Sequence, residues 1–234
     1  MDNKFHGNFT QQDGLPEIAI ERATRVLRSG RLHRYNLGKD EIGEVGSLEL
    51  EFAKFINVKY CLAVASGGYT LSTALRALGV GHGDNVLTNA FTLAPVPGAI
   101  ASVGAKPIFV GVTENLVIDL DDLEAKSQNA KVLMLSHMRG HICDMDKLLS
   151  ICTSNNIQLI EDCAHTMGAK WRDRWSGTDG VIGCYSTQTY KHINSGEGGL
   201  LVTNNPDIMA KATMLSGSYM LYDRHPAGPE KQHY

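Results

Sequence analysis

Short apolar runs alternate with amphipathic stretches through the middle of the chain. Runs with the length of single strands are CLAVAS (61–66), NVLTNAF (85–91), KPIFVGV (106–112), KVLMLSH (131–137) and IQLIED (157–162). Between them, apolar positions recur at helical spacing in LSTALRALG (71–79), PVPGAIASVG (95–104) and MDKLLSICTSNN (145–156). This alternation predicts an α/β domain built on a largely parallel sheet with right-handed crossovers.

Helical patterns and a glycine-rich segment flank this alternation. Helices are predicted over residues 17–29 and 44–55, where apolar residues recur at helical spacing. After the run CYST (184–187) come the glycine-rich segment, a strand GLLVTN (199–204) and a helix from residue 206 to about 216.

These patterns divide the chain into three parts. Residues 1–36 form an N-terminal segment that contains a helix, and residues 37–216 form the large α/β domain. Residues 217–234 are polar and lack periodicity, so we interpret them as a tail or as the stub of a missing C-terminal domain.

The composition is that of an ordinary globular domain and narrows the function classes. Of 234 residues, 43% are hydrophobic and 20% are charged, and the formal net charge is −3. This charge gives no reason to expect a nucleic acid partner, and no run of about twenty apolar residues predicts a membrane span. We find no export signal at the N-terminus, which leaves the cytoplasm as the expected location. The five cysteines include no C-x-x-C pair and are expected to be reduced, mostly buried thiols.

Polar residues follow the predicted strands, where open α/β sheets bind their ligands. They are Ser66-Gly67-Gly68, His137, Asp162 and Ser186. The segment SGGYT (66–70) opens a helix with small residues, so its free N–H groups can approach an anion closely. A tight strand-to-helix turn without a ligand explains the same residues.

Two charged residues carry chemistry only if they are held in a pocket. Asp162 ends an apolar strand, where a carboxylate needs a cation or hydrogen-bond donors, although it also suits a helix N-cap. Lys191 lies between hydroxyl residues and the sequence GEGG. A packed lysine can have a lowered pKa and form a Schiff base, whereas most lysines are solvated.

Taken together, these motifs resemble the DegT/DnrJ/EryC1/StrS family of sugar aminotransferases, within fold type I of the pyridoxal-phosphate enzymes. The segment ASGGYTLSTALRALGVGHGDNV is similar to the family's S-G-T-x-A-L…L-G-x-G-x-G-D-E-V, and IEDCAHTMGA to E-D-A-A-Q-A-x-G-A. CYSTQTYKHINSGEGGLLVTN is similar to F-S-F-x-x-x-K-x-I-x-x-G-E-G-G-x-x-x-T-N. The resemblance runs from about Gly30 to Ser216. It implies a three-layer αβα large domain with a mostly parallel mixed sheet, which binds pyridoxal 5′-phosphate.

The resemblance also implies roles for individual residues. Lys191 matches the lysine that binds the cofactor covalently and moves the proton during catalysis, and Asp162 matches the partner of the ring nitrogen. Ser186 matches a hydroxyl that binds the phosphate together with the amides of Gly67 and Gly68. His165 falls where the family usually has a glutamine that contacts the phenolic oxygen, and histidine can donate there too.

The chain departs from the family pattern at several positions. Gly68 replaces a threonine, Leu93 stands where many relatives have an aromatic residue, and His192 replaces an asparagine. A related subgroup with histidine in place of the lysine performs dehydration, and Lys191 argues against that reaction here. Members also continue through a C-terminal domain, most of which this chain is expected to lack.

Other interpretations of the same segments stay open. His137 and His141 have metal-ligand spacing only if they are helical, and Gly140 between them disfavours a helix, so no metal site is expected. Cys163 beside His165 resembles a thiol nucleophile but is more simply a small residue behind the strand end. The basic cluster Arg31, His33 and Arg34 is either a solvated face or a contact for an anionic substrate.

The sequence therefore predicts an aminotransferase that moves an amino group from an amino acid, expected to be L-glutamate, to a keto sugar that is nucleotide-linked. A free keto-sugar acid or an aminocyclitol precursor is an alternative acceptor. The alternative from another class is a cofactor-binding fragment without complete activity. The resemblance places the active site at a subunit boundary, so a homodimer is expected; large side chains at Leu32, Tyr35 and Leu37 agree with an interface.

Overall fold

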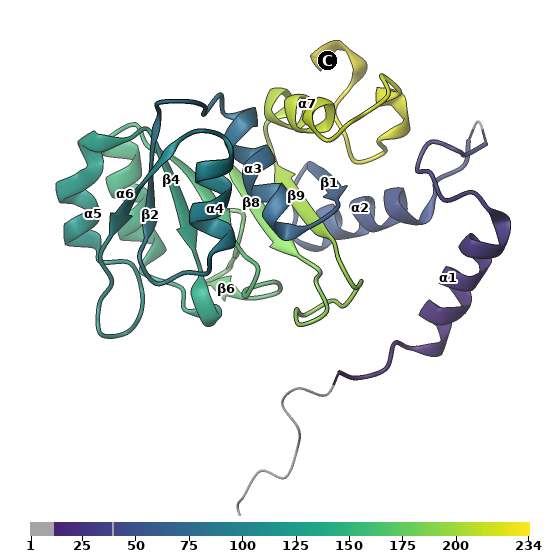
Figure 1. The fold of residues 1–234 in the computed structure, drawn as a ribbon, viewed down its shortest axis with the longest axis horizontal. Coiled ribbons are helices and arrows are strands. Elements are labelled where there is room, and N and C mark those ends of the chain that lie inside the picture. The colour runs from purple at the N-terminus through teal and green to yellow at the C-terminus, as the bar shows by residue number, and fades with distance from the viewer. Residues whose placement is uncertain (1–11, 39) are drawn as a thin grey trace, which may run out of the picture.

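A seven-stranded mixed sheet forms the centre of the computed structural model, which describes residues 12–38 and 40–234 (Figure 1). Its strands are β1 (Tyr60–Val64), β2 (Asn85–Asn89), β3 (Lys106–Val110), β4 (Val132–Ser136), β5 (Gln158–Asp162), β8 (Ile182–Ser186) and β9 (Gly199–Thr203). They lie in the order β1-β9-β8-β5-β4-β2-β3. The pairs among β3, β2, β4, β5 and β8 are parallel, and β9 runs antiparallel to both β8 and β1. The predicted mostly parallel mixed sheet is confirmed.

Helices cover both faces of the sheet and make the fold three-layered. One face packs against α3 (Gly67–Ala77), α4 (Pro95–Ser102) and α7 (Pro206–Leu215). The other packs against α2 (Glu44–Phe55), α5 (Leu120–Lys126) and α6 (Met145–Ser154). In β4, Met134 points to the first face, and Leu133 and Leu135 point to the second. Successive side chains of a strand point to opposite faces, so strands buried on both faces have the continuous apolar runs seen in the sequence.

The predicted helices and strands agree closely with the observed ones, but one helix and one two-stranded hairpin were missed. Helices 17–29 and 44–55 have the predicted bounds, and α3 begins at Gly67, within the segment SGGYT (66–70) that was predicted to open a helix. The seven-residue helix α5 begins after Asp119, whose side chain accepts from the amides of Asp121 and Asp122. The hairpin of β6 (Lys170–Trp171) and β7 (Arg174–Trp175) was also missed, because two-residue strands are too short to show a period.

The segments at the two ends of the sequence differ in how they pack. Helix α1 (Glu17–Ser29) buries no residue, and Figure 1 shows it extending away from the sheet. Residues 222–234 contain two short 3-10 helices, Tyr222–Arg224 and Lys231–His233. They pack on the domain: the amide of Cys61 in β1 donates to the carbonyl of Ala227 at 3.1 Å, and His225 is buried. The last residues are therefore part of the folded body.

Two predictions made from composition can be compared with the structure. All five cysteines are buried and have free thiols, as expected for reduced side chains. Among the helices of the part of the chain that the structure describes, none combines the length and apolar character that crossing a bilayer requires.

Candidate active site

The carboxyl ends of β4, β5 and β8 meet the first turn of α3 around a cavity of about 380 Å³. All six residues selected from the sequence line this cavity: Gly67, Gly68, Asp162, His165, Ser186 and Lys191. The strand register explains part of this convergence, because Ser136, Asp162 and Cys184 are aligned across the three neighbouring strands. Residues far apart in the sequence are thus brought to one edge of the sheet.

One wall of the cavity is formed by the first turn of α3. Ser66 caps the helix by accepting from the amide of Tyr69 at 3.1 Å, and the amides of Gly67 and Gly68 belong to the turn that lacks partners within the helix. A Cβ added to Gly67 would lie 2.7 Å from the Cβ of Ser186, so glycine is what lets Ser186 approach the helix end. At Gly68 an added Cβ meets only Ser66 Oγ, at 3.9 Å, so the larger residue of the family pattern would have room. This wall suits an anion.

Among the residues that the structure describes, none forms an ion pair with the carboxylate of Asp162. Its carboxylate accepts from Ser136 Oγ at 3.0 Å and from the amide of Ala164 at 3.2 Å. Burial raises the pKa of Asp162, and these hydrogen bonds and the nearby His137 and Lys191 only partly oppose that rise. A cationic N–H group in the cavity would relieve the cost of the buried carboxylate.

Lys191 and His165 face each other across the cavity. Lys191 Nζ lies 2.7 Å from His165 Nε2, and the amide of Arg139 donates to His165 Nδ1 at 3.1 Å. Burial lowers the pKa of Lys191, against the attraction of Asp162. Burial, helped by the charges of Lys191, Arg139 and His192, lowers the pKa of His165 to about 4. The site therefore favours an uncharged imidazole at His165, and it favours the neutral amine of Lys191 more than an exposed position would.

The loop that carries Lys191 is held by hydrogen bonds between its two sides. Thr187 and Thr189 donate their amides to Gly198 and Gly196, at 2.9 and 3.0 Å, and Thr187 Oγ1 lies 2.6 Å from Ser195 Oγ. Gly196 has φ +79°, a conformation that glycine adopts without strain. The glycine-rich sequence after Lys191 thus builds a tight return into β9.

Behind Asp162, the neighbouring Glu161 is fully enclosed and satisfied. It accepts from His137 Nε2 at 3.0 Å and from the amides of Gly177, Asp179 and Gly180 at 3.0, 2.9 and 2.7 Å. Burial alone would raise the pKa of Glu161, but the hydrogen bonds and charge of His137 and the backbone amides hold it below its usual range. His137 is therefore engaged with Glu161, while His141 is exposed and lies beyond a 3-10 turn rather than in a helix with it.

Cys163 joins His137 and Glu161 in a group of potential metal ligands within 4.8 Å of one another. The two oxygens of Glu161 already accept four hydrogen bonds, which accounts for this carboxylate without an ion. Burial raises the pKa of the Cys163 thiol well above its ordinary value, which disfavours a thiolate nucleophile. We assign this group to structure.

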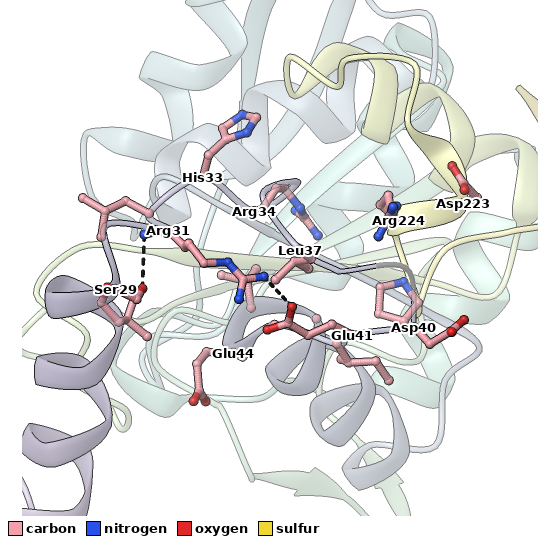
Figure 2. Close-up of a pocket in the computed structure, with 17 residues that line it drawn as sticks. Ser29, Arg31, His33, Arg34, Leu37, Asp40, Glu41, Glu44, Asp223 and Arg224 are labelled. Atoms are coloured by element: carbon pink, nitrogen blue, oxygen red, sulfur yellow. Dashed lines mark hydrogen bonds and ion pairs between the residues drawn. The ribbon is translucent and has the colours of Figure 1, made fainter.

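A second cavity, of about 490 Å³, lies between the end of α1, the start of α2 and Arg224. Figure 2 shows Arg31 in this cavity with its guanidinium directed at Glu41, to which it is hydrogen-bonded. Arg34 Nη2 binds both carboxylate oxygens of the buried Glu49, at 2.9 and 2.8 Å. Because both guanidinium groups already have carboxylate partners, the basic cluster is not a free anion site.

Several residues in the wall of the first cavity escaped the sequence analysis. They include Ser136, which binds Asp162, and Gln188 and Glu197 from the loop around Lys191. Ser136 ends the strand next to β5, and that position was the available signal. Leu93, also noted in the sequence, lies in the same wall and is 44% exposed.

Residues 16–224 match the DegT/DnrJ/EryC1/StrS aminotransferase family. The chain is 41% identical over 180 residues to a Micromonospora echinospora protein described as a candidate L-glutamine:3-amino-2,3-dideoxy-scyllo-inosose aminotransferase, covering 75% of this chain and 43% of that one. It is 35% identical over 182 residues to a GDP-perosamine synthase of Escherichia coli O157:H7, covering 77% and 50%. An aminotransferase structure from Psychrobacter cryohalolentis superposes with a TM-score of 0.81 at 30% identity, covering 92% of this chain and 53% of that one.

The chain therefore belongs to the DegT/DnrJ/EryC1/StrS aminotransferase family, whose cofactor is pyridoxal 5′-phosphate. The predicted family and the fold of type I pyridoxal-phosphate enzymes are confirmed. The chain spans about half the length of the curated relatives that it matches.

Proposed function

We propose that this chain forms the cofactor-binding part of a pyridoxal-phosphate-dependent aminotransferase, with Lys191 as the residue that binds the cofactor covalently. The observation that carries the proposal is the convergence of Lys191, Asp162 and Ser186 on one cavity at the carboxyl edge of the sheet. The wall at Gly67 is shaped for an anion such as a phosphate, and Asp162 lacks the cation that a protonated ring nitrogen would provide.

Each residue has a distinct task in this proposal. When bound, the cofactor would supply an electron sink for the reaction of the amino acid. Asp162 keeps the ring nitrogen protonated, because a buried carboxylate favours a nearby positive charge. Ser186 and the amides of Gly67 and Gly68 hold the phosphate, His165 donates to the phenolic oxygen, and Lys191 moves the proton at the substrate carbon.

For the substrates, we propose an amino acid donor, L-glutamate, and a keto sugar acceptor that is nucleotide-linked. The similarity to GDP-perosamine synthase supports the nucleotide-linked sugar. The similarity to the Micromonospora echinospora protein supports the aminocyclitol alternative and, through its name, L-glutamine as a donor. Transamination of each acceptor with each donor, followed by mass spectrometry of the aminated product, separates these pairs.

The covalent assignment can be tested directly. Addition of pyridoxal 5′-phosphate should give a visible absorbance band, and borohydride reduction followed by peptide mapping should label the peptide that contains Lys191. Lys191→Ala should lose the band, whereas Lys170→Ala, which removes an exposed lysine outside the cavity, should keep it. A label on another lysine contradicts the assignment.

The second candidate function, for this chain by itself, is cofactor binding without turnover; the chain covers 43% and 50% of the length of the two relatives. Bleaching of the visible band by L-glutamate or L-glutamine would show the first half-reaction and exclude it. A stable band in the presence of both amino donors would support it. The cytoplasmic location expected from the sequence stays a prediction.

A further inference from the structure

The two ring nitrogens of His165 have different partners. The backbone amide of Arg139 donates to Nδ1 at 3.1 Å, and Lys191 Nζ lies 2.7 Å from Nε2. A peptide N–H is only a donor, so Nδ1 has to be an unprotonated acceptor. A neutral imidazole with a bare Nδ1 carries its proton on Nε2. The proton of His165 therefore faces the lysine nitrogen.

A donor that faces Lys191 Nζ needs a lone pair on that nitrogen. An ammonium group has three donors and no acceptor, so a charged Lys191 would set N–H against N–H. A cationic His165 would in turn set an Nδ1–H against the amide of Arg139. The Arg139 amide, the His165 ring and Lys191 Nζ have matching donors and acceptors only when the imidazole and the amine are both neutral.

The turn between β4 and α6 presents the amide that orients His165. Arg139 has φ 57° and ψ 19°, the left-handed conformation, and Gly140 follows with φ 86°. A left-handed conformation is strained for a non-glycine residue and persists where the surrounding structure holds it. The strained residue is the one whose amide reaches His165.

We propose that His165 is a positioning residue, locked in its Nε2–H tautomer by the Arg139 amide, which holds Lys191 as a neutral amine in the cofactor-free protein. The neutral amine is the form with a lone pair that can add to a carbonyl carbon. The inference rests on the proposed function, in which Lys191 binds the cofactor aldehyde.

The direction of both pKa shifts favours the neutral form of each group. Burial lowers the pKa of Lys191, and Arg139 lowers it further, whereas Asp162 raises it. Burial is the largest cause that lowers the pKa of His165 to about 4, and the charges of Arg139 and His192 lower it too. Glu197 is the second carboxylate residue among those that line the cavity.

Nitrogen-15 NMR of the cofactor-free chain, labelled in histidine, tests the tautomer, with His165→Gln identifying the signals. We expect an unprotonated Nδ1 and a protonated Nε2 that stay unchanged from pH 8 to about pH 5, since the ring titrates lower. An Nδ1–H tautomer or a cationic ring at pH 7 overturns the proposal.

Titration of the ¹³C-methylated lysines tests the effect on Lys191. His165→Leu keeps the packing but removes the donor, so the pKa of Lys191 should rise by about one unit. His165→Gln, which can donate, should stay near wild type, and His192→Leu, which removes an exposed imidazole, should change little. An unchanged or lower Lys191 pKa in His165→Leu contradicts the proposal. If borohydride instead labels another lysine, the proposed function fails while the NMR result stands by itself.

Discussion

The two carboxylates at the end of β5 are adjacent in sequence but have opposite surroundings. Glu161 accepts four hydrogen bonds, and its pKa is held below the usual range. Asp162 has two hydrogen-bond donors, and burial raises its pKa. Successive strand residues face opposite sides of the sheet, so one carboxylate is enclosed by a loop and the other opens into the cavity. The first supports the fold, and the second is available to a ligand.

Asp162→Asn should impair turnover far more than cofactor binding. A neutral amide cannot hold a proton on the ring nitrogen, so we expect the half-reaction with the amino donor to slow at least about a hundredfold, or about 3 kcal/mol of barrier. Stopped-flow decay of the cofactor band measures this, with equilibrium dialysis for binding. Asp173→Asn, in the exposed turn of the β6–β7 hairpin, is the control. A near-wild-type rate would remove Asp162 from the site.

Glu161→Gln should destabilise the fold because the NH2 group of the glutamine would face the N–H groups from which the carboxylate now accepts hydrogen bonds. Breaking a buried charged network of this kind costs about 3 kcal/mol. The folded pKa of Glu161 is depressed, so its contribution is present above the unfolded pKa and is lost as the pH falls through the folded value. Urea unfolding should therefore show the largest difference from wild type near pH 7 and a shrinking one below about pH 4.5. If the difference in unfolding free energy between Glu161→Gln and wild type does not depend on pH, the assignment of Glu161 as an ionised carboxylate is contradicted.

At the scale of elements, one buried ion pair attaches the N-terminal segment to the large domain. Glu49 of α2 is fully buried, binds Arg34, and accepts from the amide of Ala63 in β1 at 2.7 Å. Burial raises the pKa of Glu49, and Arg34 and the Ala63 amide oppose the rise. Helix α1 buries no side chain, so the segment that follows it is held by this ion pair together with the hydrogen bond between Tyr35 and His225.

Arg34→Met should destabilise the protein by about 3 kcal/mol near pH 8, because Glu49 is left charged and unpaired. The pKa of Glu49 in the folded state should then rise further above its pKa in the unfolded state. A carboxyl group whose pKa is higher in the folded than in the unfolded state stabilises the fold at low pH, and this stabilisation is lost as the pH rises. The loss of stability in Arg34→Met should therefore shrink as the pH falls from 8 to 5. Urea unfolding over this range measures it.

Arg31→Met is the matched control, since it removes an exposed pair with Glu41 and should change stability little at any pH. Hydrogen exchange should report loosening of residues 30–38 in Arg34→Met and not in the control. Equal effects of the two substitutions would contradict the special role of the buried pair.

At the scale of the whole molecule, large apolar side chains remain exposed on and after α1. Ile18, Leu27 and Leu32 are 64%, 67% and 65% exposed. Tyr35 and Leu37, the other residues noted as interface candidates, are half-buried, and Tyr35 Oη lies 2.8 Å from His225 Nε2. A cluster of exposed apolar side chains is typical of an interaction surface.

We expect the chain to form a homodimer at micromolar concentration when pyridoxal 5′-phosphate is bound. Sedimentation velocity measures this, and Leu32→Glu should weaken association without lowering the urea midpoint, because Leu32 contributes little to the core. A fully occupied monomer with normal half-reaction activity would show that no residue from a partner is needed. The roles proposed for Lys191 and Asp162 would remain.

Much of the fold could be predicted because it depends on local patterns. The apolar runs of β4 and β5 and the helical spacing in α6 reflect burial of each element on its own faces. The missed helix α5 has seven residues, and its start depends on the single cap Asp119. The packing of residues 222–234 could not be predicted, since it depends on a contact between Ala227 and Cys61.

The sequence alone determined most of the helices and strands, the family to which the chain belongs, and the residue types at the strand ends. The tertiary structure alone decided the partners of those residues. Arg34 reaches Glu49 rather than a substrate, His137 reaches Glu161 rather than His141, and the Arg139 amide orients His165 toward Lys191. The physical reason is that periodicity records burial along one element, whereas a hydrogen bond depends on where two distant segments meet.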